Sequence, residues 1–565
     1  MKNQLTLTGQ TLNISDLMLA IHNNWAIDID AKALEKVAFC RKVLEDKIAA
    51  GDVIYGVNTG FGSNVDVIIS PENAIEMQTN LLRSHACGTG EALDNNIVKA
   101  MMIIRLNTLL QGHSGVRVVL IETFQKIINK GVLPVIPSQG SVGASGDLCP
   151  LSHMGLALLG EGKVTYQAKV YEGEDIKTLY KSLGISPLKL SYKEGLALNN
   201  GTTLMAALGA ILVHKAEQLC QNSTMVACLA FEAIGARKAA FTPQIHELRR
   251  HDGQNHINQY INNIVEDSAM IGSTCQQLLN LIPSEIYDNL APSVKANLEK
   301  VKAGQLLKLS VEDCNQIPAK WQPFVRFAVK KAIPQDAYSI RCTPQVLGAS
   351  WQAIQHAKNV IEGELNAVVD NPIMLPETGD IISGGNFHGQ PIALVLDYLK
   401  IAIAEIGNLL ERQTNKLCDP HHNDGLPAYL AMDAGLHSGM MIPQYAAAAL
   451  VSENKVLAHP ASVDSIPTCG NQEDHVSMGP IAGRQALEML HNVEKILAIH
   501  LLTAAQAVDL RQNQFAQLGL QMPKMATNTK NCYNNLRQHV SFMAEDRFLH
   551  ADIQTTLNNL PSIFA

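Results

Sequence analysis

The chain has 565 residues, of which 47% are hydrophobic, 17% charged and only 5% aromatic. This apolar content excludes a disordered protein, because such a chain can bury a large core. The formal net charge of -8, with no block of basic residues, argues against nucleic acid or an anionic membrane as the main partner. The 11 cysteines include no CxxC pair, which argues against a disulfide scaffold and a thiolate zinc site.

The sequence shows no segment that would export or anchor the protein. Polar residues return directly after Met1–Leu7, so we do not expect a signal peptide. No apolar run approaches the ~18 residues of a membrane span. The sequence therefore predicts a cytoplasmic protein without a membrane partner.

Taken in chain order, the predicted elements are mostly helices. The first ~60 residues combine helix and strand signals and predict a small mixed cap. Apolar residues then recur at helical spacing over 97–110, 396–412, 444–458 and 484–510. The last segment would form a helix roughly 40 Å long, which is more than one small domain can cover. We therefore expect an all-α fold, with a long central helix bundle and a smaller mixed N-terminal cap.

We expect three consecutive domains along the chain. They are an N-terminal domain at 1–205, the long-helix bundle at 206–515 and a C-terminal extension at 516–565. The bundle should carry a helical insertion at about 270–325, outside the core, which ends shortly before Gln335. The clearest helix of this insertion has one apolar face, formed by Leu290, Val294, Leu298 and Val301.

Glycine gathers in three short segments between the predicted helices. The first surrounds Asn58, the second surrounds Ser145, and the third directly precedes Asn386-Phe387-His388. Glycine costs helix stability and adopts dihedral angles that other residues avoid, so these segments predict turns. Binding and catalytic residues concentrate on loops held by rigid elements, which makes the three segments candidates for a site.

The loop from Gly140 to Asp147 permits several interpretations. Its glycines do not follow GxGxxG spacing, no GK[ST] follows, and the GxSxG nucleophile elbow does not match. Ser145 could be the nucleophile of a serine amidase. Alternatively, the tripeptide Ala144-Ser145-Gly146 could cyclise through the glycine nitrogen and lose water, which would leave an electrophilic imidazolone ring. An ordinary loop that enters a helix capped by Asp147 is the third interpretation, and the residues alone leave all three open.

Five motifs occur in order: Tyr55-Gly56-Val57-Asn58-Thr59-Gly60-Phe61-Gly62, Gly143-Ala144-Ser145-Gly146-Asp147-Leu148, Asn199-Asn200-Gly201-Thr202, Gln335-Asp336-Ala337-Tyr338-Ser339-Ile340-Arg341-Cys342 and Gly384-Gly385-Asn386-Phe387-His388. Together they resemble the aromatic amino acid ammonia-lyase family, whose members carry a 4-methylidene-imidazol-5-one (MIO) group. The resemblance covers roughly residues 50 to 510. It implies that Ala144-Ser145-Gly146 forms the MIO group without an external cofactor.

The resemblance also implies roles for single residues around this group. Tyr55 would be the base, and Asn200 would hydrogen bond the MIO oxygen as charge develops there. Tyr338 would take part in proton transfer. Arg341 would grip the substrate carboxylate with its guanidinium group.

The pocket itself would be completed by further side chains. The resemblance implies that Gln335 and Phe387 line the pocket. Ser84-His85 and Asn471-Gln472-Glu473-Asp474-His475 resemble histidine ammonia-lyases within the family, which implies that His85 and Glu473 face the imidazole of the substrate. The implied reaction is the elimination of ammonia from L-histidine to give trans-urocanate.

Alternatives to this reaction remain. Gly389-Gln390 stands where histidine ammonia-lyases usually have Ala-Glu, so a phenylalanine/tyrosine ammonia-lyase or an aromatic 2,3-aminomutase is possible. A serine amidase would need a lysine or a second serine near Ser145 as its base. A catalytically inactive helical scaffold would be expected to have lost the tripeptide or the tyrosines, which are present.

Two expectations concern metals and assembly. His246-Glu247 is followed by His251, one residue too far for an HExxH zinc motif, so we expect no metal site. The predicted long helices expose more apolar surface than one subunit can hide, which predicts a homotetramer. The resemblance adds that each site draws residues from several subunits.

Overall fold

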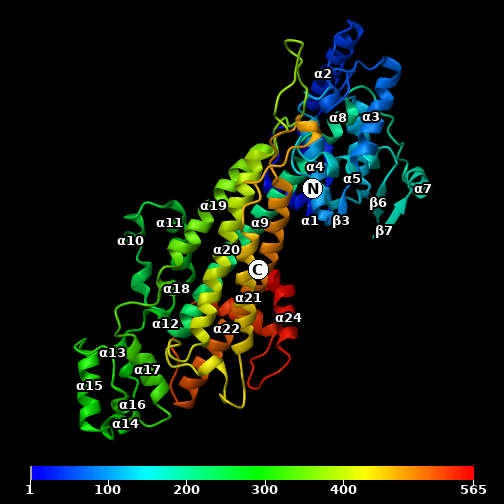
Figure 1. The fold of residues 1–565 in the computed structure, drawn as a ribbon. Coiled ribbons are helices and arrows are strands. Elements are labelled where there is room, and N and C mark those ends of the chain that lie inside the picture. Colours follow the sequence, from blue (N-terminus) through cyan, green and yellow to red (C-terminus); the bar gives the residue numbers. More distant parts are fainter. Residues whose placement is uncertain (1–2) are drawn as a thin grey trace. The chain divides into compact units, whose positions relative to one another are not determined.

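The computed structural model describes residues 3–565 and divides the chain into two compact units (Figure 1). Unit 1 comprises the residues up to Lys215, then Gln355–Lys400 and His459–Leu487. Unit 2 comprises Ala216–Ile354, Ile401–Ala458 and Glu488–Ala565. Each unit is therefore assembled from three separate stretches of sequence.

This division differs from the three consecutive domains expected from the sequence. Residues 355–400 and 459–487 belong to the same unit as the N-terminal 215 residues. The C-terminal residues 516–565 belong to unit 2, where the backbone N–H of Ala526 donates to the buried carboxylate of Glu232 at 2.8 Å. Such pairings join residues that are hundreds of positions apart, and local sequence patterns carry no signal for them.

Helices dominate both units. Those of unit 1 are α1 Ile14–His22, α2 Ala31–Ala49, α3 Pro71–His85, α4 Asn95–Leu109, α5 Val118–Asn129, α6 Leu148–Leu158, α7 Glu174–Leu183 and α8 Glu194–Asn199. Those of unit 2 are α10 Pro243–Glu247, α11 Asp252–Ile264, α12 Ala269–Gly272, α13 Cys275–Leu279, α14 Ser284–Asp288, α15 Pro292–Lys302, α16 Val311–Asn315, α17 Gln322–Lys330, α18 Tyr338–Arg341, α21 Met441–Leu457, α23 Thr527–His539 and α24 Leu549–Ile563. Four long helices contribute residues to both units: α9 Thr203–Ile234, α19 Thr343–Glu364, α20 Gln390–Cys418 and α22 Gly479–Gln517.

The strands form small sheets within unit 1. In parallel pairing, β1 Gln4–Leu7 lies beside β2 Ala26–Ile29. The antiparallel pairs are β3 Thr89–Ala92 with β5 Pro137–Gln139, β4 Leu133–Pro134 with β6 Lys163–Tyr166, β6 with β7 Lys169–Glu172, and β8 Ile373–Leu375 with β9 Asp380–Ile382. The prediction of a mostly helical protein is therefore confirmed, and the strands lie in the unit that contains the N-terminal residues.

The long helices pack against one another within unit 2. The Thr414 hydroxyl of α20 hydrogen bonds the His500 ring of α22 at 2.9 Å, and both side chains are buried. Ser350 of α19 donates to a backbone carbonyl of α20 at 3.0 Å. The periodic residues expected over 484–510 are buried: Ala486, Leu490, Val493, Leu497, Leu501, Ala504 and Val508. Among residues 3–565, no helix is both long and apolar enough to cross a membrane.

The segment at about 270–325 is helical, as the sequence predicts, and has its own hydrophobic cluster. In α15 the expected apolar face is buried, and Leu298 is fully inaccessible. The cluster also includes Trp321 and Phe324, and it reaches Phe515 of α22 within the same unit. Phe324 packs edge-on against Phe515 at 5.4 Å between ring centroids. The segment is thus stabilised by its own core and by contacts with α22.

Leu298→Ala should destabilise this cluster by ~2–5 kcal/mol, because it removes a fully buried side chain and leaves a cavity. Lys300→Ala on the exposed face of the same helix is the matched control and should change stability by less than about 0.5 kcal/mol. Urea unfolding, followed by hydrogen exchange in α15, measures both changes. Equal, small effects of the two substitutions would show that α15 is not held by this core.

Candidate active site

Unit 1 contains two adjoining cavities of about 560 and 490 Å³. They share Tyr55, Ser145, Asn200 and Glu473 among their lining residues. The larger cavity is also lined by Ala144 and Phe387, and the smaller one by His85. Gly146 lines a third cavity of about 310 Å³ together with Ala144, His85 and Glu473. The structure therefore brings together eight of the residues that the sequence singles out.

Glycine is required in the loop that carries Ser145. Gly146 has a φ of +75°, and a Cβ atom there would lie 2.2 Å from the carbonyl oxygen of Gly201. The same oxygen accepts from the backbone N–H of Asp147 at 2.7 Å, and the Gly201 N–H donates to Ser145 O at 3.2 Å. Two backbone segments thus run in direct contact, which only a residue without a side chain allows.

The other end of the loop is fastened to a different part of unit 1. Gly143 has a φ of +66°, and its carbonyl oxygen accepts from the Ser477 hydroxyl at 3.1 Å. The Met478 N–H donates to Val142 O at 2.9 Å. Backbone contacts thus hold the tripeptide on both sides, at Gly143 and at Gly146, which restricts its conformations.

Asp147 anchors the loop to helix α9. It is the residue before α6, yet its carboxylate accepts from the backbone N–H groups of Leu204 at 2.8 Å and Met205 at 3.1 Å, in the first turn of α9. The side chain is completely buried, and burial raises the pKa of Asp147 to about 7. The carboxyl group therefore caps α9 and ties the loop to that helix.

Ser145 is paired with a carboxylate. Its hydroxyl donates to Glu473 at 2.8 Å, and the second oxygen of Glu473 accepts from the Thr468 hydroxyl at 2.8 Å. A serine amidase would need a lysine or a second serine at this position, and the observed partner is neither. Thr468 orients the carboxylate, and no sequence pattern pointed to it.

Tyr55 projects its phenol toward the same cavity. The hydroxyl oxygen accepts from the backbone N–H of Gly62 at 3.0 Å. Burial raises the pKa of Tyr55, whereas the hydrogen bond from Gly62 lowers it in part, because it favours the charged oxygen. The phenol therefore has one backbone donor in place to stabilise a phenolate.

His85 is the last residue of α3 and is half-buried. Its Nδ1 lies 2.9 Å from the Ser84 hydroxyl. Burial lowers the pKa of His85, so the ring is neutral at pH 7. A neutral imidazole has one donor and one acceptor nitrogen and can hydrogen bond a polar ring of a ligand.

Asn200 supplies the clearest sign that a polar group belongs beside the tripeptide. Its side chain is buried, and its Oδ1 has no hydrogen-bond partner among residues 3–565. A buried polar atom without a partner costs roughly 1–3 kcal/mol. Because Asn200 lines both cavities together with Ser145, its Oδ1 can accept from a donor on a bound ligand, and its Nδ2 can donate to a carbonyl oxygen of a ring formed from the tripeptide.

Three predicted site residues do not line these cavities. Gln335, Tyr338 and Arg341 belong to unit 2. Tyr338 and Arg341 lie in the short helix α18, with the guanidinium 4.3 Å from the centre of the phenol ring. Tyr338 is 71% exposed in the single chain. The site in unit 1 is thus formed without a cation to hold a substrate carboxylate.

The cavity also contains residues that the sequence interpretation did not select. His388 and His475 line its wall, with ring centroids 5.6 Å apart. Asn371 and Gln472 line it as well. His388, His475 and Gln472 lie within the quoted motifs, and this position could have marked them as candidate site residues. Asn371 lies outside every motif, so no sequence pattern indicated that it lines the cavity.

The departure at Gly389-Gln390 has a packing reason. A Cβ atom on Gly389 would lie 2.3 Å from the Met205 Cε and 2.9 Å from the Ser477 hydroxyl. Met205 therefore occupies the space that an alanine methyl would need. Gln390 donates weakly to Ser462 O at 3.4 Å and does not line the cavities.

The histidines at 246 and 251 do not form a metal site. His246 is buried, and its ring bonds to Ala240 O at 3.0 Å and to Gln254 at 2.9 Å. These bonds use both ring nitrogens. In the described part of the chain there is no group of three or more His, Cys, Asp or Glu side chains arranged to hold a metal ion.

Comparisons with known proteins identify the family of the chain. The family model described as aromatic amino acid lyase matches residues 12–538. A histidine ammonia-lyase from Treponema denticola is 40% identical over 553 residues, covering 98% of this chain and 96% of the relative. The crystal structure of histidine ammonia-lyase from Trypanosoma cruzi is 34% identical, with a TM-score of 0.81 over 99% of this chain and 93% of that one. A tyrosine aminomutase from Streptomyces globisporus is 33% identical, with a TM-score of 0.85 over 99% and 97%. The chain therefore belongs to the aromatic amino acid lyase family.

Proposed function

We propose that this protein is a histidine ammonia-lyase that eliminates ammonia from L-histidine to give trans-urocanate. The observation that carries the proposal is the meeting of Ala144-Ser145-Gly146 with Tyr55, Asn200, His85 and Glu473 around adjoining cavities. The histidine ammonia-lyase relatives at about 40% identity over nearly the whole chain support it.

We propose that the tripeptide cyclises to the MIO group. The close approach of Gly146 to Gly201 and the anchoring of Gly143 support this, because they restrict the backbone on both sides of the tripeptide. The MIO group supplies the electrophile that a poor leaving group such as ammonia needs. The amide Nδ2 of Asn200 would donate a hydrogen bond to the carbonyl oxygen of this group.

The surrounding residues divide the remaining tasks. The phenolic oxygen of Tyr55 takes the proton from the β-carbon of the substrate, with Gly62 N–H stabilising the charge. His85 and Glu473 hydrogen bond the substrate imidazole, which fixes its orientation. Phe387 forms an apolar part of the wall. Excluding water by closing around the ring would strengthen each of these polar contacts.

We further propose that a homotetramer completes the site. Tyr338 and Arg341 are needed to move a proton and to hold the carboxylate, and they belong to the unit that does not contain the cavity. The exposure of Tyr338 supports their insertion into the site of a neighbouring subunit. Gln335, three residues before Tyr338 on the same exposed stretch, would line that site with them.

The assembly is tested by size-exclusion chromatography with light scattering. Several large apolar residues on α20 and α21 are exposed in the single chain: Leu394, Tyr398, Ile401, Ile442, Tyr445 and Val456. We expect four copies of the 61.3-kDa chain per particle. Tyr445→Glu should reduce the particle size and the activity together, since a charge in a buried contact is costly. A monodisperse and fully active monomer would contradict the tetramer.

The choice of substrate is tested by comparing kcat/KM for histidine, phenylalanine and tyrosine. A phenyl ring can make no hydrogen bond to the imidazole of His85 or to the carboxylate of Glu473, so phenylalanine should be slower by about 10²-fold or more. Glu473→Gln and His85→Phe should each lower activity on histidine much more than on phenylalanine. If the wild-type protein prefers phenylalanine or tyrosine, the histidine assignment is wrong and the lyase family assignment remains.

An aromatic 2,3-aminomutase is the second candidate. Two observations support this candidate. The chain is 33% identical to a tyrosine aminomutase, and it has Gly389-Gln390 where histidine ammonia-lyases usually have Ala-Glu. The two reactions differ in their product, because a mutase returns the amine to the β-carbon. Amino acid analysis of the spent reaction should show free ammonia and urocanate, and accumulation of a β-amino acid would favour the mutase.

A further inference from the structure

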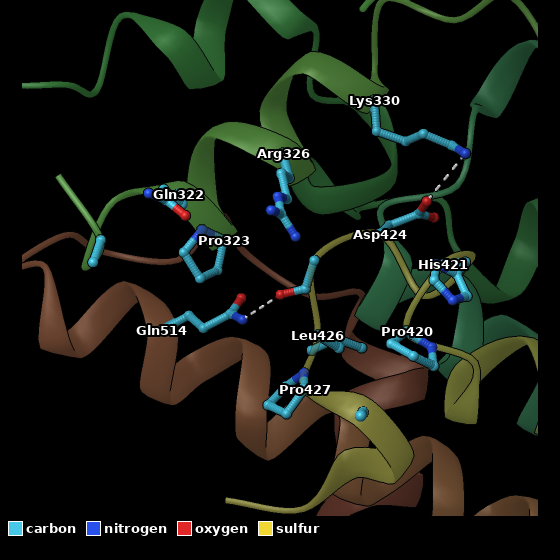
Figure 2. Close-up of a pocket in the computed structure, with 13 residues that line it drawn as sticks. Gln322, Pro323, Arg326, Lys330, Pro420, His421, Asp424, Leu426, Pro427 and Gln514 are labelled. Carbon is cyan, nitrogen blue, oxygen red and sulfur yellow. Dashed lines mark hydrogen bonds and ion pairs between the residues drawn. The ribbon is translucent and has the colours of Figure 1, made fainter. Parts of the chain in front are cut away.

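Unit 2 contains a cavity of about 590 Å³ that the proposed reaction does not use. Figure 2 shows it between α17, the loop at 420–428 and α22. Its volume lies in the range of pockets that bind small molecules. Both polar and apolar side chains line it, so the nature of a ligand can be argued from their chemistry.

The walls of this cavity are fixed by hydrogen bonds to the loop backbone. Gln514 donates to Gly425 O at 2.7 Å, and the fully buried Arg511 donates to Asp424 O at 2.9 Å. Gly425 has a φ of +84°, and a Cβ atom there would lie 2.5 Å from Pro323 O. The loop is therefore packed directly against the start of α17. A ligand would meet a preformed pocket and would lose little free energy in ordering it.

Positive charge is in excess around the cavity. Asp424 is the single carboxylate among its lining residues, and it already has two lysine partners: Lys330 at 3.3 Å and Lys416 at 3.6 Å. Arg326 is exposed and points toward the cavity in Figure 2. Arg326 takes part in none of the ion pairs found among residues 3–565. Its guanidinium group hydrogen bonds the thiol of Cys314. His421 adds a further donor at the rim.

One part of the lining is apolar and rigid. Pro323, Pro420 and Pro427 face the cavity with Leu426 (Figure 2). Proline rings present flat hydrocarbon surface and lose no side-chain entropy when a ligand covers them. Such a wall suits a compact apolar body and offers nothing to a bare, strongly hydrated ion.

We propose that this cavity binds a small organic anion, with its phosphate or carboxylate held by Arg326 and Lys330 and its apolar body against the prolines. The guanidinium group of Arg326 can donate two parallel hydrogen bonds to either headgroup. Lys330 would share its charge between Asp424 and the ligand. None of the residues that line this cavity has a role in the proposed reaction, so the proposal stands or falls independently of that reaction.

Isothermal titration of the full-length protein with phenyl phosphate, benzoate and inorganic phosphate tests the proposal. Phenyl phosphate or benzoate should bind saturably, and Arg326→Gln should weaken that binding at least tenfold while leaving the melting temperature and the lyase activity unchanged. Arg326→Lys should retain part of the affinity, because it keeps the charge and loses the planar fork. Arg249→Gln, an exposed arginine of unit 2 that does not line the cavity, is the matched control and should bind as wild type.

Aromatic anions can also enter the cavity at Ser145. Binding at the unit 2 cavity is therefore the part of the wild-type binding heat that is absent in Arg326→Gln. Tighter phenyl phosphate than benzoate binding would identify the headgroup as phosphate, and the reverse order as carboxylate. The proposal is overturned if neither aromatic anion shows a component that Arg326→Gln removes. It is also overturned if inorganic phosphate binds as tightly as phenyl phosphate, because the apolar wall would then have no role.

Discussion

Ser145→Ala should abolish ammonia release from histidine while leaving the fold intact. Alanine has no hydroxyl to eliminate, so the methylidene carbon of the proposed MIO group cannot form. The loss should be on the order of 10³-fold or more, as when the reactive group of a covalent catalyst is removed. The side chain makes one hydrogen bond, to Glu473, so stability should change by only about 1 kcal/mol.

The direct measurement is the intact mass. Wild-type protein should be lighter than its encoded chain by two water molecules, and Ser145→Ala should lack the loss that comes from the serine hydroxyl. Ser141→Ala is the matched control in the same loop, where the hydroxyl accepts from Gly143 N–H at 3.2 Å but lies outside the tripeptide. It should retain the mass loss. Wild-type protein at its full encoded mass would remove the MIO mechanism, while membership of the lyase family would stand.

Tyr55→Phe should lower kcat for histidine by about 10²–10⁴-fold, the usual contribution of a positioned acid or base. The substitution removes only the oxygen that accepts from Gly62 N–H, so the melting temperature should hardly change. Tyr192→Phe in the same unit is the control. Its hydroxyl makes one long contact, 3.5 Å to Pro71 O, and its loss should leave the activity unchanged.

The pH dependence gives this test a second readout. Burial raises the pKa of Tyr55, so at neutral pH the phenol is mostly protonated. The fraction of phenolate, and with it kcat/KM, should therefore rise as the pH increases through the alkaline range. Tyr55→Phe should remove that rise together with the rate. An alkaline rise of unchanged size in the variant would assign the base to another group.

Local sequence patterns were sufficient to predict several of the helices. The helical spacing of apolar residues predicted α4, α20, α21 and α22, and the face of α15 is buried as expected. The reason is that a helix buries residues three and four positions apart. Its buried face can therefore be recognised from a short stretch of sequence. The ordered motifs likewise selected Tyr55 and Ser145, because the chemistry depends on the residue types that a motif records.

Tertiary structure alone decided which of these segments meet. The hydroxyl of Ser145 reaches the carboxylate of Glu473 across 328 positions, and Thr468 orients that carboxylate without any sequence signal. Only the fold assigns Arg341 to the second unit and the cavity to the first, and only packing brings the Met205 Cε to 2.3 Å from where a Cβ atom of residue 389 would lie. Contacts of this kind depend on how whole helices and loops fill space, since a close-packed interior fixes each residue by neighbours far away in the chain.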